Sequence, residues 1–217
     1  MFTYNASGEQ NTDYKLVDND VYYKTEKLGT LELQIPGAHN RSNALAAFSV
    51  AHHFGITAKD ILSSLKHFTG AHRRFEIKGS YENAVIIDDY AHHPVEIKAT
   101  LQAVREKYPK ARVCAVFQPH QFSRTHALLE EFKGAFKDAD LVIVPNIYAA
   151  RDTEEDKAKI SAESLVESLN KAGVKTLWGQ GIEETLLLLQ QKASDFDVII
   201  TMGAGDIWKI SSELTKG

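Results

Sequence analysis

From residue 74 to the end of the chain, predicted strands alternate with predicted helices, and this alternation constrains the fold most. The strands are expected at 84–88, 112–117, 140–144, 174–178 and 196–201, and the helices at 95–107, 124–137, 161–172, 181–191 and 206–215. Repeated strand–helix units favour a mostly parallel sheet with right-handed crossovers. The pattern therefore predicts an α/β, Rossmann-like sheet flanked by helices.

The first part of the chain has a different pattern. Short strands are predicted at 2–5, 14–17, 21–24 and 30–35, followed by helices at about 40–54 and 58–67. Thr57 is expected to cap the start of the second helix, and Gly55 the end of the first. Because the pattern changes near residues 70–78, we expect one unit at 1–74 and another at 75–217.

Composition excludes several classes of protein. The formal net charge is −4, so the chain has no basic footprint for nucleic acid. Its apolar runs are too short to insert in a membrane, and no signal peptide is visible, which favours the cytoplasm. The single cysteine, Cys114, lies within a predicted strand, where we expect a buried, inert thiol.

Polar residues gather directly after two of the predicted strands. They are Asp88, Asp89, Tyr90, His92 and His93 after the strand at 84–88, and Gln118, His120 and Arg124 after the strand at 112–117. In open α/β sheets, ligands bind at the carboxyl ends of the strands. One carboxylate could simply cap the following helix beside a solvent-facing histidine pair. So many polar groups in one turn favour a site.

A third polar group opens the helix predicted at 40–54. His39, Asn40 and Asn43 lie at its start, and side chains three apart share a helix face. A side-chain amide can pair with the edge of adenine through N6 and N7. Asn also favours helix starts for local reasons, so this group alone would indicate only caps.

Together the three groups resemble the Mur ligase family of ATP-dependent amide-bond ligases, over nearly the whole chain and most thinly in 1–30. The matching strings are His-Asn-x-x-Asn-Ala at 39–44, Arg-Arg-Phe-Glu at 73–76, Asp-Asp-Tyr-Ala-His-His-Pro at 88–94, Phe-Gln-Pro-His at 117–120 with Arg124-Thr125, and Gly-Ala-Gly-Asp at 203–206. The string at 117–120 favours the alanine-adding member over murein-peptide-recycling and folylpolyglutamate-type ligases. A non-catalytic nucleotide-binding module is the remaining alternative.

The resemblance implies that 1–74 is the C-terminal part of the central ATP-binding domain and 75–217 the C-terminal Rossmann-like domain. No glycine here is followed by lysine, so the P-loop of the family is missing. We therefore expect a fragment, inactive alone, of an enzyme of peptidoglycan precursor synthesis. That enzyme would join L-alanine to UDP-N-acetylmuramate through an acyl phosphate. It would use ATP and magnesium, with the metal ligands mainly in the missing N-terminal part.

The resemblance also implies roles for individual residues on the ATP side. Asn40 and Asn43 would read the adenine, with His39 packed beside it. Arg74 would approach the phosphates, and Asp89 would accept hydrogen bonds from the ribose hydroxyls. Arg73 and Arg74 could instead be a surface pair, and of the two only Arg74 matches the family's invariant position. Asp88 is expected to cap or support Asp89.

Tyr90, His92, His120 and Arg124 would face the amino acid and the acyl phosphate. Arg124 is the natural partner for the alanine carboxylate. Either His92 or His120 would orient or deprotonate the amine. The remaining positions are expected to be structural: His93 before Pro94, Ser123 and Asp206 as N-caps, and Glu154–Lys157 as a solvated loop. Gln121, which stands where the family often has Arg, is given no role.

Overall fold

The computed structural model describes residues 3–6 and 12–216, and the chain divides into two compact units between Gly70 and Ala71. This division lies near the boundary expected from the sequence. Each unit has its own hydrophobic core.

The first unit packs two helices on a small sheet. Its elements are β1 (Tyr4–Asn5), β2 (Tyr14–Val17), β3 (Asp20–Tyr23), β4 (Glu26–Thr30), α1 (Ala38–His53) and α2 (Ala58–His67). The sheet order is β1-β2-β3-β4, parallel between β1 and β2 and antiparallel elsewhere. Leu45 and Phe48 of α1 are fully buried against Leu16, Val21 and Ile61.

Most expectations for this unit are confirmed. The strand at 14–17 and the helix at 58–67 have the predicted bounds, and the Thr57 side chain accepts a hydrogen bond from Asp60 N–H. The strand predicted at 30–35 is wrong, because β4 ends at Thr30. That residue pairs with Asp20, the first residue of β3, and Leu31 N–H then donates to Asn19 O in the turn before β3, so no strand residue remains to extend the pairing. Phe2 of the first predicted strand lies outside the described residues.

The second unit is built on a sheet of order β5-β6-β10-β7-β8-β9, in which every neighbouring pair is parallel except β5 with β6. Its strands are β5 (Glu76–Tyr81), β6 (Ala84–Asp89), β7 (Val113–Phe117), β8 (Leu141–Val144), β9 (Thr176–Trp178) and β10 (Val198–Met202). Its helices are α3 (Pro94–Lys107), α4 (Phe122–Ala127), α5 (Leu129–Lys133), α6 (Glu154–Lys159), α7 (Ala162–Lys171), α8 (Ile182–Lys192), the 3-10 turn Ala193–Asp195 and α9 (Trp208–Leu214). The predicted α/β class is confirmed.

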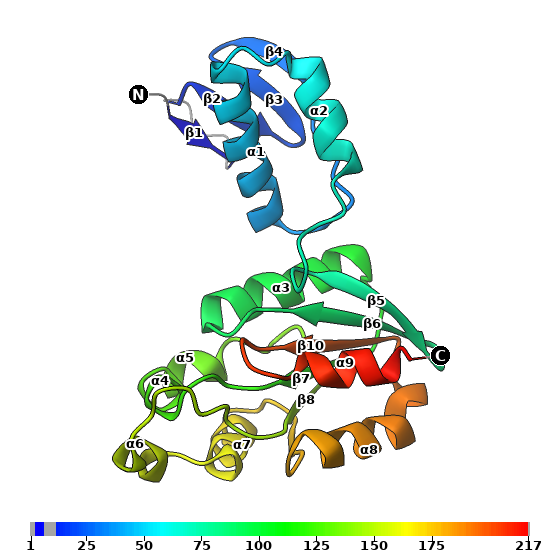
Figure 1. Cartoon of the computed structure of the whole chain (residues 1–217). Coiled ribbons are helices and arrows are strands. Elements are labelled where there is room, and N and C mark those ends of the chain that lie inside the picture. Colours follow the sequence, from blue (N-terminus) through cyan, green and yellow to red (C-terminus); the bar gives the residue numbers. More distant parts are fainter. Residues whose placement is uncertain (1–2, 7–11, 217) are drawn as a thin grey trace. The chain divides into compact units, whose positions relative to one another are not determined.

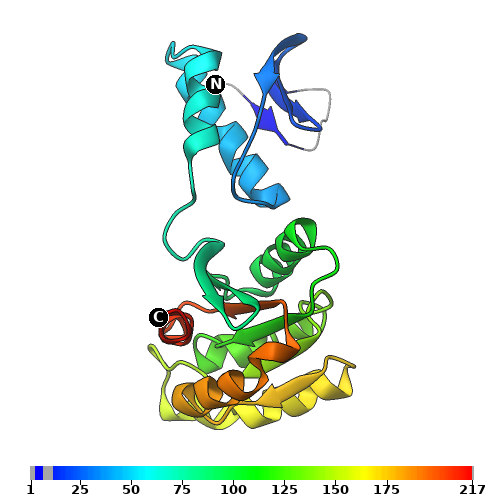
Figure 2. The ribbon, with the colours of Figure 1, turned by 90° about the vertical axis from the view of Figure 1, so that its right-hand side faces the viewer.

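Both faces of this sheet are buried, as expected for a parallel sheet. Along β7, Val113, Ala115 and Phe117 point into a core covered by α3, α5 and α7, while Cys114 and Val116 point into one covered by α8 and α9. Figure 1 and Figure 2 show these helices on the two sides of the sheet. Burial raises the pKa of the Cys114 thiol, in keeping with the inert residue predicted.

Several local expectations are wrong. The helix predicted at 124–137 is two short helices, because the backbone turns at Leu128 between α4 and α5. Residues 154–159 form helix α6 rather than a loop, begun by a capping box between Thr153 and Asp156. Ser123 lies inside α4, whose N-cap is Gln121. The strand β5 was not predicted at all.

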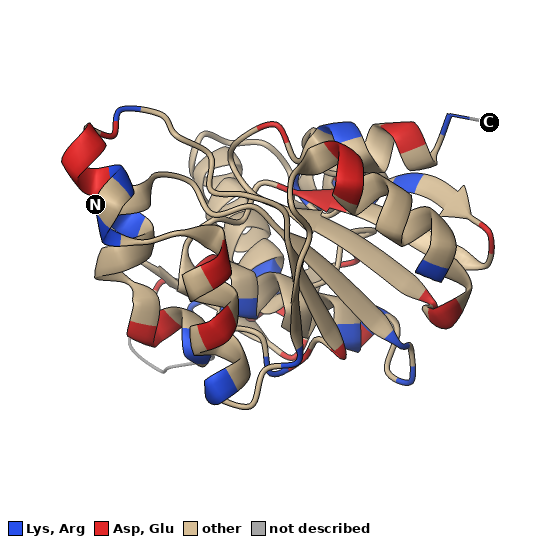
Figure 3. Ribbon diagram, turned by 90° about the horizontal axis from the view of Figure 1, so that it is seen from below, with Lys and Arg blue, Asp and Glu red and all other residues tan. Residues whose placement is uncertain are grey.

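The charged residues do not separate by sign. On the ribbon in Figure 3, acidic and basic residues are interspersed along the helices. Ion pairs three or four residues apart, such as Lys157 with Glu154, are part of this pattern. Within residues 3–6 and 12–216, no helix has the length and apolar character needed to cross a bilayer.

Candidate functional site

The candidate site lies in the second unit, where β6, β10 and β7 end. Turns follow these neighbouring strands at 90–93, 203–207 and 118–121, the first and last of them rich in polar residues. The loop 145–153, which follows β8, adjoins the last of these turns through a bridge between His120 and Tyr148. This is the sheet edge at which α/β proteins bind ligands.

Asp89, the last residue of β6, is a buried carboxylate with several donors. One oxygen accepts a hydrogen bond from Phe75 N–H at 2.7 Å, and the other accepts from Ala91 N–H at 2.7 Å and from the Thr100 hydroxyl at 3.3 Å. Its residue exposure is 4%. Asp89 therefore holds together three segments around the end of β6: the chain before β5, the turn after β6, and helix α3.

Arg73 and Asp88 form a buried ion pair beneath the turns. Arg73 Nε lies 2.8 Å from Asp88 Oδ2, and its guanidinium also donates to the carbonyl oxygens of Gly203 and Gly205 at 2.6 and 3.2 Å. Burial raises the pKa of Asp88, although Thr201 and Arg73 oppose this. Arg73 thus ties the start of the unit to the β10 turn. Asp88 supports this network, rather than Asp89 directly.

Tyr90 and His92 stand at the end of β6 with Arg74. The Arg74 guanidinium lies 5.2 Å from the centre of the Tyr90 ring, and the Tyr90 and His92 rings meet edge to face at 5.5 Å. His93 is the N-cap of α3 and forms a capping box with Glu96, whose carboxylate also accepts from His92 N–H at 3.0 Å. The expectation that His93 is structural is confirmed.

His120 connects the two strand ends. Its ring centre is 6.2 Å from that of His92, and it stacks on Tyr148 at 5.4 Å with an angle of 15°. Burial lowers the pKa of His120, and Arg124 and His92 lower it further, against the opposite effect of Asp152. The imidazole is therefore held toward its neutral form.

Three buried polar atoms at this edge lack partners. Within the described part of the chain, none of His120 Nδ1, Arg124 Nη1 and Asp152 Oδ2 makes a hydrogen bond. Buried polar atoms are nearly always paired in folded proteins, so such atoms at a strand edge call for an explanation. A bound ligand with an amine and a carboxylate would supply partners for His120 and Arg124.

Gln118 was predicted to lie at this edge of the sheet, but the sequence suggested no role for it. The structure shows that its side chain links two neighbouring loops. Its amide nitrogen donates to Asn146 at 3.1 Å and Asp206 at 2.9 Å, and its oxygen accepts from Ile207 N–H at 3.1 Å. Asp206 is thus engaged by Gln118 and is not the N-cap of α9, which is Ile207. A side chain at Gly205 would collide with Gln118 and Tyr148, which explains the glycine.

His39, Asn40 and Asn43 belong to the first unit, at the start of α1. Asn40 Nδ2 donates to the Pro36 carbonyl at 2.7 Å, while Asn43 is exposed. The structure therefore groups Tyr90, His92, His120 and Arg124 in the second unit and the Asn pair in the first.

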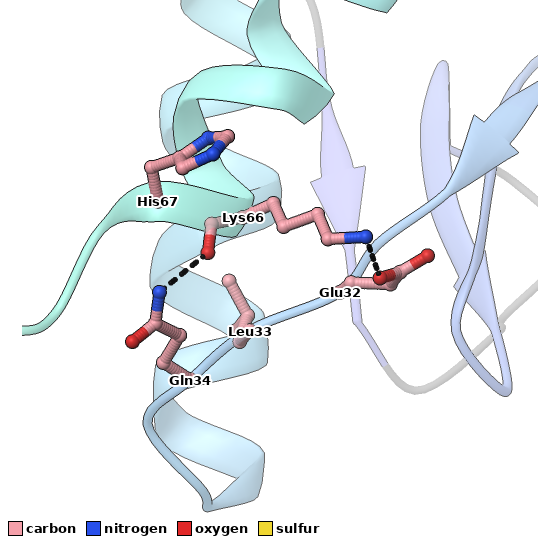
Figure 4. Close-up of a pocket in the computed structure, with 5 residues that line it drawn as sticks. All are labelled: Glu32, Leu33, Gln34, Lys66 and His67. Atoms are coloured by element: carbon pink, nitrogen blue, oxygen red, sulfur yellow. Dashed lines mark hydrogen bonds and ion pairs between the residues drawn. The ribbon is translucent and has the colours of Figure 1, made fainter.

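The first unit also has a shallow pocket, lined by Glu32, Leu33, Gln34, Lys66 and His67 (Figure 4). Its polar groups bind one another: Lys66 Nζ lies 2.6 Å from Glu32, and Gln34 donates to Lys66 O at 3.0 Å. The pocket therefore offers little unmet hydrogen bonding to a ligand.

The described residues do not fit a metal centre. Across 3–6 and 12–216, no three His, Cys, Asp or Glu side chains are grouped so that they could hold an ion. Divalent cations such as magnesium are usually bound through carboxylates and substrate phosphates.

Comparison with known proteins agrees with the motifs. The family described as "Mur ligase, glutamate ligase domain" matches residues 73–205. A curated UDP-N-acetylmuramate–L-alanine ligase from Clostridium acetobutylicum is 45% identical over 191 residues, which are 88% of this chain and 41% of that protein. The chain thus spans about two fifths of the length of such relatives.

Solved structures are similar over almost the entire chain. The UDP-N-acetylmuramate–alanine ligase of Thermotoga maritima matches with a TM-score of 0.78 and 27% identity, over 99% of this chain and 47% of that one. A murein peptide ligase of Psychrobacter arcticus, at TM-score 0.62 and 21% identity over 96% of this chain and 45% of that one, shares the fold. The resemblance inferred from the motifs is confirmed, and the chain belongs to the Mur ligase family.

Proposed function

We propose that this chain is part of a cytoplasmic, ATP-dependent ligase that joins L-alanine to UDP-N-acetylmuramate in peptidoglycan precursor synthesis. Residues 1–74 would belong to its central ATP-binding domain, and 75–217 would be its C-terminal domain. The ligase names of the relatives support the reaction. The family's acyl-phosphate route would activate the lactyl carboxylate, which the alanine amine then attacks.

One observation carries the proposal for the second unit. His120 Nδ1 and Arg124 Nη1 are buried at one sheet edge and have no hydrogen-bond partner in the described residues. The α-carboxylate of alanine would pair with the Arg124 cation, since charge-assisted bonds of this kind are strong. The neutral His120 would accept a proton from the amine or orient it. His92 and Tyr90 would complete the wall around the amine.

Other residues would serve the ATP side of the reaction. Arg74 is exposed beside Tyr90, where its guanidinium could approach a phosphate group. Asn40 and Asn43, with His39 beside them, would contact the adenine from the start of α1. A ribose hydroxyl at Asp89 would join a carboxylate that already accepts three hydrogen bonds. Magnesium would be held by parts of the ligase outside the matched segment.

The proposal can be tested by a chimera. The segment of the Clostridium acetobutylicum ligase that matches this chain is replaced by residues 1–217, and phosphate release is measured with ATP and UDP-N-acetylmuramate. The acceptors are L-alanine, glycine, L-serine, D-glutamate and the tripeptide L-alanyl-γ-D-glutamyl-diaminopimelate. The unmodified ligase is the control. We expect L-alanine to give the highest kcat/KM.

Two outcomes would contradict the proposal. A preference for the tripeptide would favour the murein-peptide-recycling alternative. A folded chimera that binds nucleotide but turns over no acceptor would favour the non-catalytic module. Circular dichroism and thermal unfolding establish that the chimera is folded before either conclusion is drawn.

A further inference from the structure

The loop between β8 and α6 lies against the turn that carries His120. Tyr148 N–H donates to Pro119 O at 2.8 Å, and Gln121 N–H donates to Tyr148 O at 2.9 Å. The Tyr148 ring also stacks on the His120 imidazole. The position of His120 therefore depends on this loop as well as on the strand that precedes it.

Asp152 lies near the end of the same loop, just before α6, but its side chain caps the start of α4. Its Oδ1 accepts hydrogen bonds from Ser123 N–H and from the Ser123 hydroxyl, both at 3.0 Å. Ser123 lies in the first turn of α4, whose N-cap Gln121 provides no side-chain bond. The first N–H groups of a helix have no partner within it. Asp152 supplies that partner from a distant part of the chain.

The backbone at Gln121 adopts an unfavourable conformation that its neighbours must stabilise. Gln121 has a φ of 73°, in the left-handed region that residues other than glycine rarely adopt. Such a conformation persists only when the surrounding structure fixes it. Here the Tyr148 carbonyl holds the amide of Gln121, and Asp152 holds Ser123 two residues later. His120 and Arg124 lie on either side of this constrained segment.

Asp152 also acts on the site by its charge. Burial alone would raise the pKa of its carboxyl, but the N–H groups of Ser123 and Phe122 and the Ser123 hydroxyl lower it by more. The resulting carboxylate stabilises protonated His120, against burial, Arg124 and His92. Among the described residues, the charged and titratable groups that face His120 are Asp152, Arg124, His92 and Tyr148, whose ring stacks on the imidazole.

We propose that Asp152 is a positioning residue of the amino-acid site, which holds the first turn of α4 so that His120 and Arg124 face the substrate together. The identity of that substrate rests on the proposed function. The coupling of Asp152 to α4 and His120 rests on the contacts alone.

The coupling is tested on residues 1–217 by NMR titration of the His120 imidazole, whose resonance is identified with a His120→Gln variant. Asp152→Asn keeps an oxygen that accepts from Ser123 but removes the charge, so the pKa of His120 is expected to move down. Asp156→Asn is the matched control, because Asp156 caps α6 through Thr153 and pairs with Lys159. It should leave the titration of His120 unchanged.

Hydrogen exchange tests the cap itself. In Asp152→Ala, exchange of the Ser123 amide should become roughly five- to tenfold faster, the effect of losing an N-cap. Unchanged exchange, together with an unchanged His120 titration in Asp152→Asn, would overturn the proposal. If Asp152→Ala does not fold, the Asn variant still decides, because it keeps the capping oxygen.

Kinetics in the chimeric ligase separate this inference from the proposed function. Asp152→Asn should move the acidic limb of kcat/KM for L-alanine to lower pH, because neutral His120 would persist there, while KM for ATP changes less than about twofold. An enzyme that makes no product from L-alanine would refute the proposed function and leave the NMR coupling intact. Normal turnover with an unmoved pH profile would refute the positioning role.

Discussion

Arg124 provides a cation whose Nη1 atom is buried and unpaired among the described residues. In the chimeric ligase, Arg124→Ala should raise KM for L-alanine roughly ten- to hundredfold, since a hydrogen bond to a charged group contributes about 1.5–3 kcal/mol. KM for ATP should change little. Steady-state kinetics with each substrate varied in turn gives both values.

Arg112 is the matched control for this substitution. It is exposed at the opposite end of β7, beside the Phe196 ring. Arg112→Ala should leave both KM values near those of the unmodified chimera. An equal rise in KM for alanine and for ATP in Arg124→Ala would show that Arg124 is not specific to the amino acid.

His120 should make stability depend on pH. Its pKa lies below the ordinary value of 6.5, first because of burial, so the unfolded chain takes up a proton before the folded one does. Stability is thus expected to fall as pH decreases through the window just below 6.5. Urea unfolding of residues 1–217 between pH 5 and 7.5 measures this, and His120→Gln should flatten the dependence there.

His126→Gln is the matched control, because it removes an exposed imidazole from the same helix, α4. This variant should retain the wild-type dependence of stability on pH. A His120→Gln variant with the wild-type slope would mean that His120 is not held toward its neutral form by the fold.

The sequence was most informative about residues that directly follow a buried strand. Tyr90, His92, His120 and Arg124 could be named because parallel strands end at one edge, and the structure brings them together there. Tyr148 and Asp152 could not be named, since their link to His120 and Ser123 crosses from one loop to another. No local pattern encodes such a contact.

Among the elements, β6 and β10 depend on the buried pair of Arg73 and Asp88. Arg73→Ala should lower the free energy of unfolding by about 3–5 kcal/mol, because it leaves a buried carboxylate without its cation. The loss should shrink as pH falls, because burial already raises the pKa of Asp88 and a protonated carboxyl group needs no cation. Urea unfolding of residues 1–217 at pH 7 and pH 4.5 provides the comparison.

An exposed pair provides the contrast. Lys157 and Glu154 also form an ion pair, 2.7 Å apart, but both residues are exposed. Lys157→Ala should lower the free energy of unfolding far less than Arg73→Ala does. The double variant Arg73→Met with Asp88→Leu should be more stable than Arg73→Ala alone. If it is not, the buried charge is not the source of the loss.

The elements that the sequence did not reveal share a physical cause. β5 reads Glu-Ile-Lys-Gly-Ser-Tyr, and as an edge strand it has no continuous apolar run. α6 buries no side chain, so it lacks the apolar stripe by which a helix is recognised. By contrast, α2 and α3 were predicted within a residue, because capping residues and buried apolar positions agree there.

At the scale of the whole molecule, residues 1–217 alone should not form the amide bond. They contain no Gly-Lys element to hold the β- and γ-phosphates, and positioning of phosphates accounts for most of phosphoryl-transfer catalysis. ATP should bind weakly, with a Kd around millimolar, or about 4 kcal/mol. Phosphate release with all three substrates, and calorimetry with ATP, test these expectations. Robust turnover would require a different catalytic centre.

The place of β10 in the sheet has a consequence for how the protein is made. β10 is the last strand along the chain, yet it pairs with both β6 and β7. On the ribosome, these two strands emerge long before the strand that joins them, so the sheet of the second unit cannot be completed until Met202 has been synthesised. Until then the facing edges of β6 and β7 are unpaired, and unpaired strand edges promote aggregation. A stop codon just before Val198 would remove the central strand, so the second unit would lose its fold even though β5 to β9 are all present.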